Sequence, residues 1–523
     1  MRFSIITVPA TLLIILTLAA PLWAQEVDWV ARFDGGGTVN DIALAMAADA
    51  SGNVYVAGYS YGPTGDDDVR LVKFSAAGEF LWTQVFSGGF GWDDARDLHV
   101  AADGTVTIVG FTTTETDWDA LIAQYAPDGT LNWLTTWDGS GIDDGKAVAV
   151  DDAGYIYVAI ESDGPDLSDD IVTMRLTPAG EIDWVQRYAG AGGWNDVAAD
   201  IAVTGAGVAT VTGTARDATF DLIALQYESN GMLRWSDKYD PLGYSYEIGV
   251  HVALDDAGRA YIVGSELTAE GTNDICVLCY ETNGTRAWVR TFDGDPDTYD
   301  DGISLALGDD LVVVTGCSEV STNDRDVRTI AFDMSGNQLW TDRFAGPMIR
   351  GDDCGEVALI HDDGLITVVA TSDSLLYEED FLTLRYTADG DLVWSARYNG
   401  PGNRTDEATG GVVLPNGAVL VGGVSPDVTV DFAVVKYAGN GGDDDTVDDD
   451  TVDDDTTDDD TVDDDTTDDD TVDDDTVDDD TADDDTDDDT SDDDTDDDTA
   501  DDDEDDDDAA SDDDDDDDDG CGC

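Results

Sequence analysis

Acidic side chains recur at two fixed phases of this sequence, and they are the first residues whose type and spacing could do chemistry. One set precedes the first strand expected in each of eight repeats: Asp41, Asp94, Asp144, Asp196, Glu247, Asp301, Asp353, and then Asp406 or Glu407. A second set precedes the third expected strand: Asp68, Asp119, Asp170, Asp221, Asp274, Asp326, Asp380 and Asp431. Several oxygen ligands are what Ca²⁺ requires, so the first set is a candidate metal site and Ca²⁺ the one cofactor that it suggests.

A structural role competes with metal binding at these positions. In six of the eight repeats a hydroxyl follows the second expected strand: Ser60, Thr112, Ser162, Ser318, Ser372 and Ser425. A turn carboxylate that accepts hydrogen bonds from a nearby hydroxyl and from backbone N–H groups would fix every repeat in the same way. Neither the EF-hand spacing nor the glycine-rich calcium nonapeptide is present. The eightfold recurrence favours the structural role and leaves metal binding as the alternative.

The aromatic residues outside the repeat pattern are the second candidate site. Trp92, Trp118 and Trp194 fall in loops on the same side as the carboxylates, and Tyr246 and Tyr299 occupy comparable places. Flat aromatic rings beside carboxylates and amides suit sugars, which stack on the ring and form hydrogen bonds at its edge. The alternative is that these rings lie flat and cap the ends of the sheets.

The sequence contains few residues or motifs that are typical of a catalytic site. The chain has three histidines, and it contains no H-E-x-x-H, G-x-S-x-G or phosphate-binding G-x-x-x-x-G-K-[ST] motif. We therefore expect no enzyme activity. A carboxylate-based polysaccharide hydrolase or lyase is the alternative, because so acidic a chain always offers carboxylate pairs.

A repeat of about 50 residues must position these side chains. Tryptophans recur at spacings of 51 to 54 residues, and another aromatic follows each after four residues. The tryptophans are Trp29, Trp82, Trp133, Trp184, Trp235, Trp288, Trp340 and Trp394. Each period holds four short strand-like runs separated by turn signals; in the first they are 42–47, 53–58, 69–74 and 80–86.

Four-stranded antiparallel units of this period predict an all-β, eight-bladed β-propeller. Runs that are apolar on both faces, such as 222–225, fit sheets packed on both sides. The first expected strand of the chain, around Trp29, is of the fourth type, which carries the repeated tryptophan. The last expected strand is of the third type, and no tryptophan-bearing strand follows it. We therefore expect the N-terminal strand to complete the last blade and close the ring. Cys276 and Cys279 fall on one expected strand and point to opposite faces, so we expect buried packing and no mutual bond.

The repeat typified by residues 49–58 and 68–82 resembles the bacterial β-propeller repeats called SBBP. The resemblance covers about residues 29–437. The resemblance implies a secreted or surface propeller, and it assigns no catalytic residue to this chain.

The ends of the chain predict three parts. Residues 1–24 read as a signal peptide, 25–438 as the propeller, and 439–523 as a disordered Asp/Thr-rich tail that ends in Gly-Cys-Gly-Cys. Residues 443–519 hold 52 of the 122 acidic residues and no Lys or Arg, so the rest of the chain has a net charge of −48. Cys521 and Cys523 are candidate attachment points.

These features together predict an exported or cell-surface, non-catalytic module that binds or displays an extracellular ligand. A polysaccharide or a protein is the expected partner. The acidic field excludes nucleic acid, no membrane span is expected after signal cleavage, and the default state is a monomer.

Overall fold

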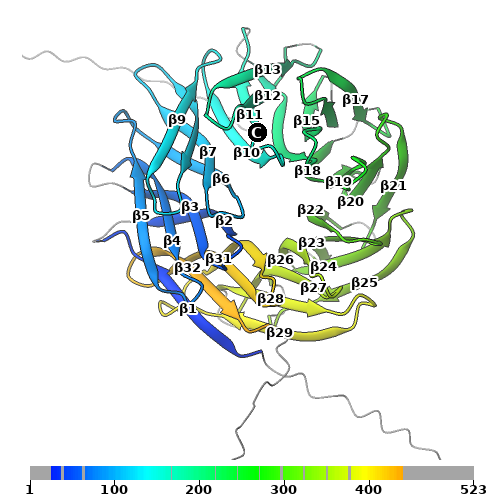
Figure 1. Ribbon diagram of the computed structural model, residues 1–523. Coiled ribbons are helices and arrows are strands. Elements are labelled where there is room, and N and C mark those ends of the chain that lie inside the picture. The colour runs from blue at the N-terminus through cyan, green and yellow to red at the C-terminus, as the bar shows by residue number, and fades with distance from the viewer. Residues whose placement is uncertain are drawn as a thin grey trace, which may run out of the picture. The chain divides into compact units, whose positions relative to one another are not determined.

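Each repeat folds into one four-stranded antiparallel sheet, and the computed structural model arranges eight such sheets as the blades of a propeller (Figure 1). The structure describes residues 25–439 except 37–39, 62–64, 166–167, 192, 218, 244–245, 270, 295–297, 322–323, 349–350 and 375–377. The predicted signal peptide, the acidic tail beyond residue 439, and Cys521 and Cys523 lie outside the described residues. No helix of the described part is long and apolar enough to cross a membrane.

The strands follow the chain from blade to blade. Blades 1 to 4 contain β2 (Asp41–Ala48), β3 (Val54–Tyr61), β4 (Asp67–Phe74), β5 (Phe80–Phe86); β6 (Asp93–Val100), β7 (Val106–Thr113), β8 (Trp118–Tyr125), β9 (Leu131–Trp137); β10 (Asp143–Val150), β11 (Ile156–Asp163), β12 (Asp169–Leu176), β13 (Ile182–Tyr188); and β14 (Val197–Val203), β15 (Ala209–Arg216), β16 (Phe220–Tyr227), β17 (Leu233–Tyr239).

Blades 5 to 8 contain β18 (Glu247–Leu254), β19 (Ala260–Leu267), β20 (Asn273–Tyr280), β21 (Arg286–Phe292); β22 (Asp300–Leu307), β23 (Leu311–Ser321), β24 (Asp324–Asp333), β25 (Gln338–Phe344); β26 (Asp353–Ile360), β27 (Ile366–Asp373), β28 (Glu379–Tyr386), β29 (Leu392–Tyr398); and β30 (Glu407–Val413), β31 (Val419–Pro426), β32 (Val430–Tyr437), β1 (Val27–Phe33). The eighth blade has the strand order β1-β32-β31-β30. The predicted fold and its closure by the N-terminal strand are therefore confirmed.

The hydrophobic core lies between the blades. Each of eight clusters of buried apolar residues joins two adjacent blades, and the cluster between blades 8 and 1 contains residues of β1, β3, β4, β31 and β32. Adjacent blades cover both faces of each sheet, which accounts for the second and third strands that are apolar on both faces. Cys276 and Cys279 are buried and free on β20, as expected.

The repeated tryptophan joins one blade to the next. The Trp29 indole donates from Nε1 to the carbonyl of Ala76 at 3.2 Å, and its ring covers Gly78. A Cβ on Gly78 would lie 2.7 Å from the ring, and this glycine has φ +79°, so the turn requires glycine for both reasons. Equivalent bonds join Trp82 to Pro127 at 3.1 Å and Trp133 to Pro178 at 3.2 Å.

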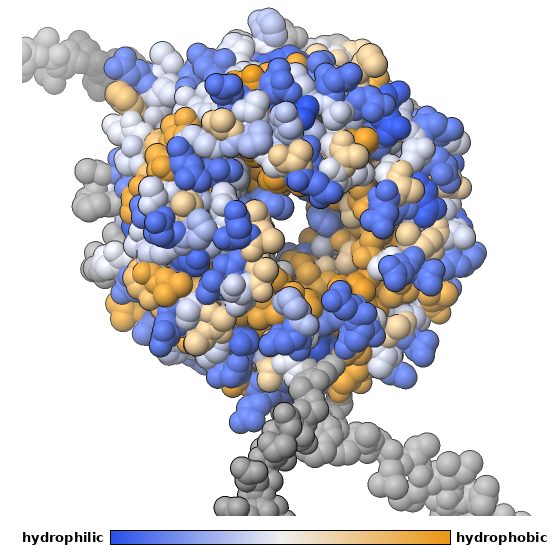
Figure 2. Space-filling view, in the orientation of Figure 1, coloured by the Kyte–Doolittle hydropathy of each residue, from blue (hydrophilic) through white to orange (hydrophobic). Residues whose placement is uncertain are grey.

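The first strand of every blade carries a register shift, as between Ala43 and Ala45 of β2. These strands line the centre of the ring, where a cavity of about 640 Å³ is bounded by residues from all eight. Figure 2 shows the central opening, with apolar surface along part of its wall and hydrophilic residues around the rim.

Candidate functional site

The two ends of the blades form two different faces, and the predicted site residues lie on one of them. The aromatic face is the side of the ring that carries two connections of each blade: the one from the second to the third strand, and the one from the fourth strand to the next blade. We call turn face the opposite side, which carries the connections from first to second and from third to fourth strand.

One buried carboxylate begins each blade on the aromatic face, and each is at most 1% exposed. They are Asp41, Asp93, Asp143, Asp196, Glu247, Asp300, Asp353 and Asp406. In blades 2, 3 and 6 the sequence-based assignment was therefore one residue late, since it gave Asp94, Asp144 and Asp301. In blade 8 the residue is Asp406, one of the two that the sequence left open.

Hydrogen bonds within the blade account for the buried carboxylates. Asp41 accepts a bond from the Gly35 backbone N–H at 2.7 Å and another from the Ser60 hydroxyl. Burial raises the pKa of Asp41, and these two bonds oppose the rise. Asp93 is held in the same way by the Gly88 N–H at 2.7 Å and by Thr112. These carboxylates fix the entrance of each blade, which is the structural role that the hydroxyl pattern favours.

The second predicted set lies inside the third strands and is largely paired with basic residues of the fourth. Arg187 contacts Asp170 at 2.9 Å and Arg32 contacts Asp431 at 2.9 Å. Three further pairs have the same geometry: Lys238–Asp221 at 2.9 Å, Arg343–Asp326 at 3.2 Å and Arg397–Asp380 at 3.5 Å. Five of the eight blades thus neutralise this aspartate with a side chain of the same sheet.

Asp94 and Asp144 pair with basic residues next to the central cavity. Asp94 lies 3.5 Å from Arg96, and Asp144 lies 2.6 Å from Lys146. Asp301 instead accepts a bond from the Ser265 hydroxyl at 3.1 Å. Because successive residues of a strand point to opposite faces of the sheet, these side chains and the buried carboxylates beside them lie on opposite faces.

Four junctions between blades bring together three carboxylates whose oxygens lie within 4.8 Å of one another. The groups are Asp34–Asp41–Asp431, Asp119–Asp138–Asp143, Asp221–Asp240–Glu247 and Asp274–Asp293–Asp300. Arg32 and Lys238 neutralise the first and third groups. At Asp119, burial and then the charges of Asp138, Asp117 and Asp143 raise the pKa. Of the described residues, these groups have the geometry nearest to that of a cation site.

The aromatic residues predicted as a ligand site are mostly exposed. Trp92 is 54% exposed, Trp194 and Tyr299 are 49% exposed, and Tyr246 is 39% exposed. Trp118 differs, because it stacks on Phe111 with ring centroids 4.2 Å apart and meets Trp92 edge-on at 6.3 Å. Trp118 therefore packs against its own blade, as the capping alternative predicts. The other four side chains are accessible to a ligand.

Backbone hydrogen bonds fix the main chain at three of the exposed aromatic residues. Thr113 donates to the carbonyl of Trp92 at 3.1 Å, Leu267 to that of Tyr246 at 2.9 Å, and Glu319 to that of Tyr299 at 2.8 Å. Each of the three rings belongs to the residue directly before the buried carboxylate of its blade. Their positions are therefore set by the rigid entrance of the blade.

In blades 2 to 6 exposed apolar residues lie directly before the buried carboxylate or within three residues of it, and we call them the aromatic arc. Phe90 and Ile142, which the sequence analysis missed, are also exposed and extend it. Asn40, Asp352 and Thr405 stand directly before the buried carboxylate in blades 1, 7 and 8. Aligning all eight repeats on that carboxylate would have revealed the arc, but this alignment needed the corrected register.

A basic side chain reinforces the arc at blade 4. The Arg216 guanidinium lies 4.6 Å from the centre of the Trp194 ring and 4.6 Å from that of Phe220. Phe220 in turn contacts Tyr246, with ring centroids 4.9 Å apart. Three rings and one guanidinium thus make a continuous platform that offers both flat apolar surface and N–H donors.

The histidines lie away from the aromatic arc. His251 lines the central cavity and accepts a bond from the Leu305 N–H at 3.3 Å. His361 is buried at the turn face, where its Nε2 lies 2.8 Å from the Thr367 hydroxyl. Burial lowers the pKa of His99 on β6. None of the three is placed to act as a general base on a ligand held by the arc.

A disulfide that the sequence analysis missed joins blades 6 and 7. Cys317 on β23 and Cys354 on β26 are bonded, with Cα atoms 4.7 Å apart. The two residues are 37 positions apart in the chain, and no spacing motif relates them. The bond ties two neighbouring blades near the aromatic face.

Comparison with known proteins supports the fold alone. The sequence matches no protein-family model and no curated protein, so the resemblance to SBBP repeats stays a prediction. Among solved structures, Sqt1 from Chaetomium thermophilum is similar with a TM-score of 0.52 and 13% identity, covering 80% of this chain and all of that one. The Pseudomonas aeruginosa periplasmic gluconolactonase has a TM-score of 0.40 and 14% identity over 68% of this chain and 97% of that one.

Proposed function

We propose that this protein is an exported, non-catalytic propeller that binds an extracellular polysaccharide along the aromatic arc. The observation that carries the proposal is the arc itself: exposed aromatic rings lie on blades 2, 4, 5 and 6, with the exposed Ile142 on blade 3, whereas polar residues precede the buried carboxylate on the other three blades. An eightfold structural need would place such rings on all eight blades. A need for stacking surface on one part of the face explains why only four blades carry them.

The chemistry of the arc suits a neutral sugar polymer. Ring faces stack against the C–H surface of a sugar, and nearby carboxylates and amides accept bonds from its hydroxyls. The net charge of −48 outside the acidic tail repels anionic polymers. Because the rings are spread over several blades, an extended chain would contact more of them than a single sugar.

Export is proposed on two grounds. The apolar N-terminal segment reads as a signal peptide, and the Cys317–Cys354 bond suits an oxidising compartment.

Affinity electrophoresis in gels that contain neutral polysaccharides tests the proposal. We expect the full chain to be retarded by at least one of them, and each of Trp92→Ala, Tyr246→Ala and Tyr299→Ala to weaken binding about threefold to tenfold. Leu339→Ala is the matched control, since Leu339 is as exposed as Trp92 but lies on the fourth strand of blade 6.

Three outcomes would overturn the proposal. Equal retardation of the wild type and a triple variant with unchanged melting temperature would remove the arc from binding. Release of new reducing ends from the bound polysaccharide would show that the protein is a hydrolase. Retardation by none of the polysaccharides would favour a display role in which the propeller holds no glycan.

A further inference from the structure

The turn face departs from eightfold symmetry at one blade. In seven blades five residues connect the first strand to the second, as with 255–259 between β18 and β19. In blade 6 only three residues connect β22 to β23, and the Gly308 N–H donates to the carbonyl of Leu311 at 2.8 Å. The blade 6 connection is therefore shorter than the connections of blades 5 and 7 beside it.

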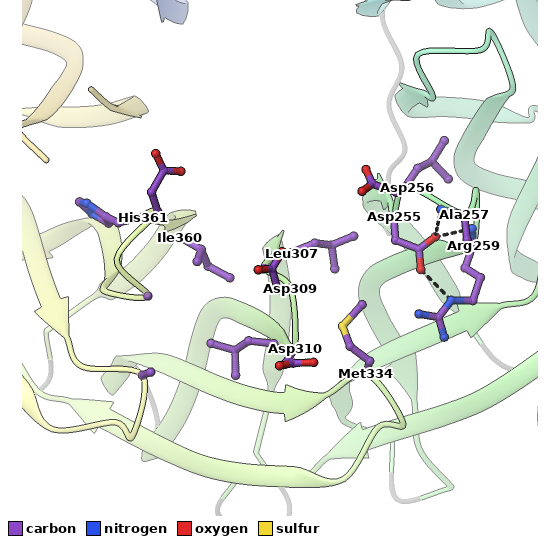
Figure 3. Close-up of a pocket in the computed structure, with 16 residues that line it drawn as sticks. Asp255, Asp256, Ala257, Arg259, Leu307, Asp309, Asp310, Met334, Ile360 and His361 are labelled. Atoms are coloured by element: carbon purple, nitrogen blue, oxygen red, sulfur yellow. Dashed lines mark hydrogen bonds and ion pairs between the residues drawn. The ribbon is translucent and has the colours of Figure 1, made fainter. Parts of the chain in front are cut away.

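The short connection leaves a depression between its neighbours, which we call the blade 6 pocket. Its volume is about 710 Å³, and its floor consists of half-buried apolar residues from blades 5 to 7: Leu254, Leu307, Leu311, Met334 and Ile360. Figure 3 shows Asp255 and Asp256 on one side, Ile360 and His361 on the other, and Leu307 and Asp309 between them. This volume is in the range that small organic ligands occupy.

Carboxylates surround this apolar floor. Asp256, Asp309, Asp310 and Asp362 are exposed and line the pocket. No described residue donates a hydrogen bond to these four or forms an ion pair with them. Asp255 differs, because its carboxylate accepts bonds from the Ala257 N–H at 3.1 Å and from the Arg259 side chain at 2.6 Å.

A ligand that satisfies both parts of the pocket must combine methylene groups with positive charge. An inorganic cation would meet the carboxylates but leave the apolar floor in water. A neutral hydrocarbon would cover the floor but displace water from four carboxylates without replacing its hydrogen bonds, which is unfavourable. A linear chain with ammonium groups at its ends covers the floor and donates several bonds to the rim.

We propose that the blade 6 pocket binds linear aliphatic polyamines. The ligand lies with its methylene chain across Leu254, Leu307 and Ile360, and its ammonium groups pair with the aspartates of three successive blades. This site is on the opposite side of the ring from the aromatic arc and does not depend on the proposed function.

Isothermal titration of the full chain with diamines at about 150 mM salt tests the pocket. The acidic tail also attracts diamines, so the test compares two variants with the same change in charge. Asp309→Asn/Asp310→Asn removes two rim charges, whereas Asp103→Asn/Asp128→Asn removes two exposed charges from blade 2 on the same face. We expect one saturable site per chain, at least about tenfold weaker in the first variant and unchanged in the second.

The length of the diamine separates the pocket from charge attraction alone. Burial of each methylene favours binding by up to about fourfold, so 1,8-diaminooctane should bind at least about tenfold more tightly than 1,4-diaminobutane. Equal affinities of the two diamines would overturn the proposal, as would equal binding by the wild type and both variants. Saturable binding of a lysine-rich peptide without binding of either diamine would also overturn it and would assign the pocket to a polypeptide.

Discussion

The stability of the propeller should depend on pH through Glu356, which lies on β26 beside the central cavity. Burial, followed by the charge of Glu407, raises the pKa of Glu356 to about 7. The other charges that act on it are Glu379 and Asp352, which raise the pKa, and Arg325, which lowers it. Arg325 is engaged with Asp352 through two bonds of 2.6 Å, so it only partly offsets the carboxylates.

The sign of the effect follows from the raised pKa. Between pH values of about 4.5 and 7, the folded protein keeps a proton on Glu356 that the unfolded chain releases. The stabilising contribution is complete below pH 4.5 and is lost as the pH rises through 7. A rise of the pKa from 4.5 to about 7 corresponds to at most about 3 kcal/mol. Because Glu356 is half-buried, solvent screening reduces this to about 1–2 kcal/mol.

Glu356→Gln should therefore stabilise the protein by about 1–2 kcal/mol at pH 8 and have little effect at pH 4.5. Urea denaturation of the variant and the wild type at both pH values measures this difference. Glu115→Gln removes the same charge from an exposed loop and controls for the net charge of the chain. An equal effect of Glu356→Gln at the two pH values, or an equal gain from Glu115→Gln at pH 8, would refute the reasoning.

Three further predictions concern the carboxylates and the disulfide. Asp93→Ala should cost about 3 kcal/mol in thermal or urea unfolding, because it leaves the Gly88 and Thr113 N–H groups and the Thr112 hydroxyl without their acceptor. Asp94→Asn should change stability by less than about 1 kcal/mol, and equal costs of the two changes would contradict the corrected register. Asp138→Asn should raise the melting temperature slightly in EDTA by relieving repulsion, and Ca²⁺ should stabilise the wild type more than this variant; equal responses to Ca²⁺ would count against a metal at this junction. Cys317→Ser/Cys354→Ser should lose about 3–4 kcal/mol, because the bond spans 37 residues, and an unchanged urea midpoint would contradict this.

The architecture could be predicted from the sequence because each repeat contains large residues at regular spacings. The tryptophan period predicts the blades, and the unmatched strand at the N-terminus predicts the closure. Both follow from local patterns that recur in every repeat. The exact members of the buried carboxylate set could not be found in this way.

Two physical facts explain that failure. Blades 2, 3 and 6 each offer two adjacent acids, as with Asp93 and Asp94, so composition does not choose between them. The register shift in the first strand, between Ala95 and Asp97 in blade 2, breaks the alternation by which a buried residue is usually recognised. The disulfide was missed for a related reason, since contact between Cys317 and Cys354 exists only once two blades are packed together.

In blade 5 the buried carboxylate and the residue that faces it both differ from those of the other blades. Where six other blades have an aspartate and a hydroxyl, blade 5 has Glu247 opposite Glu266 in the register of β18 and β19. Two facing carboxylates repel, and the Tyr239 hydroxyl donates to Glu266 at 2.6 Å. Burial raises the pKa of Glu266, and the bond from Tyr239 opposes the rise. The same junction is thus held by different chemistry.

Features that recur in all eight blades are therefore poor guides to function in this propeller. The buried carboxylates and the tryptophans are satisfied by partners within the ring, so their recurrence reflects the repeated need to join blades. The departures from symmetry leave exposed surface instead: the aromatic arc covers only part of one face, and the shortened connection of blade 6 opens a pocket on the other. Because the two departures lie on opposite faces, a ligand at one leaves the other accessible. The arc and the pocket can therefore be tested with separate variants in the same chain.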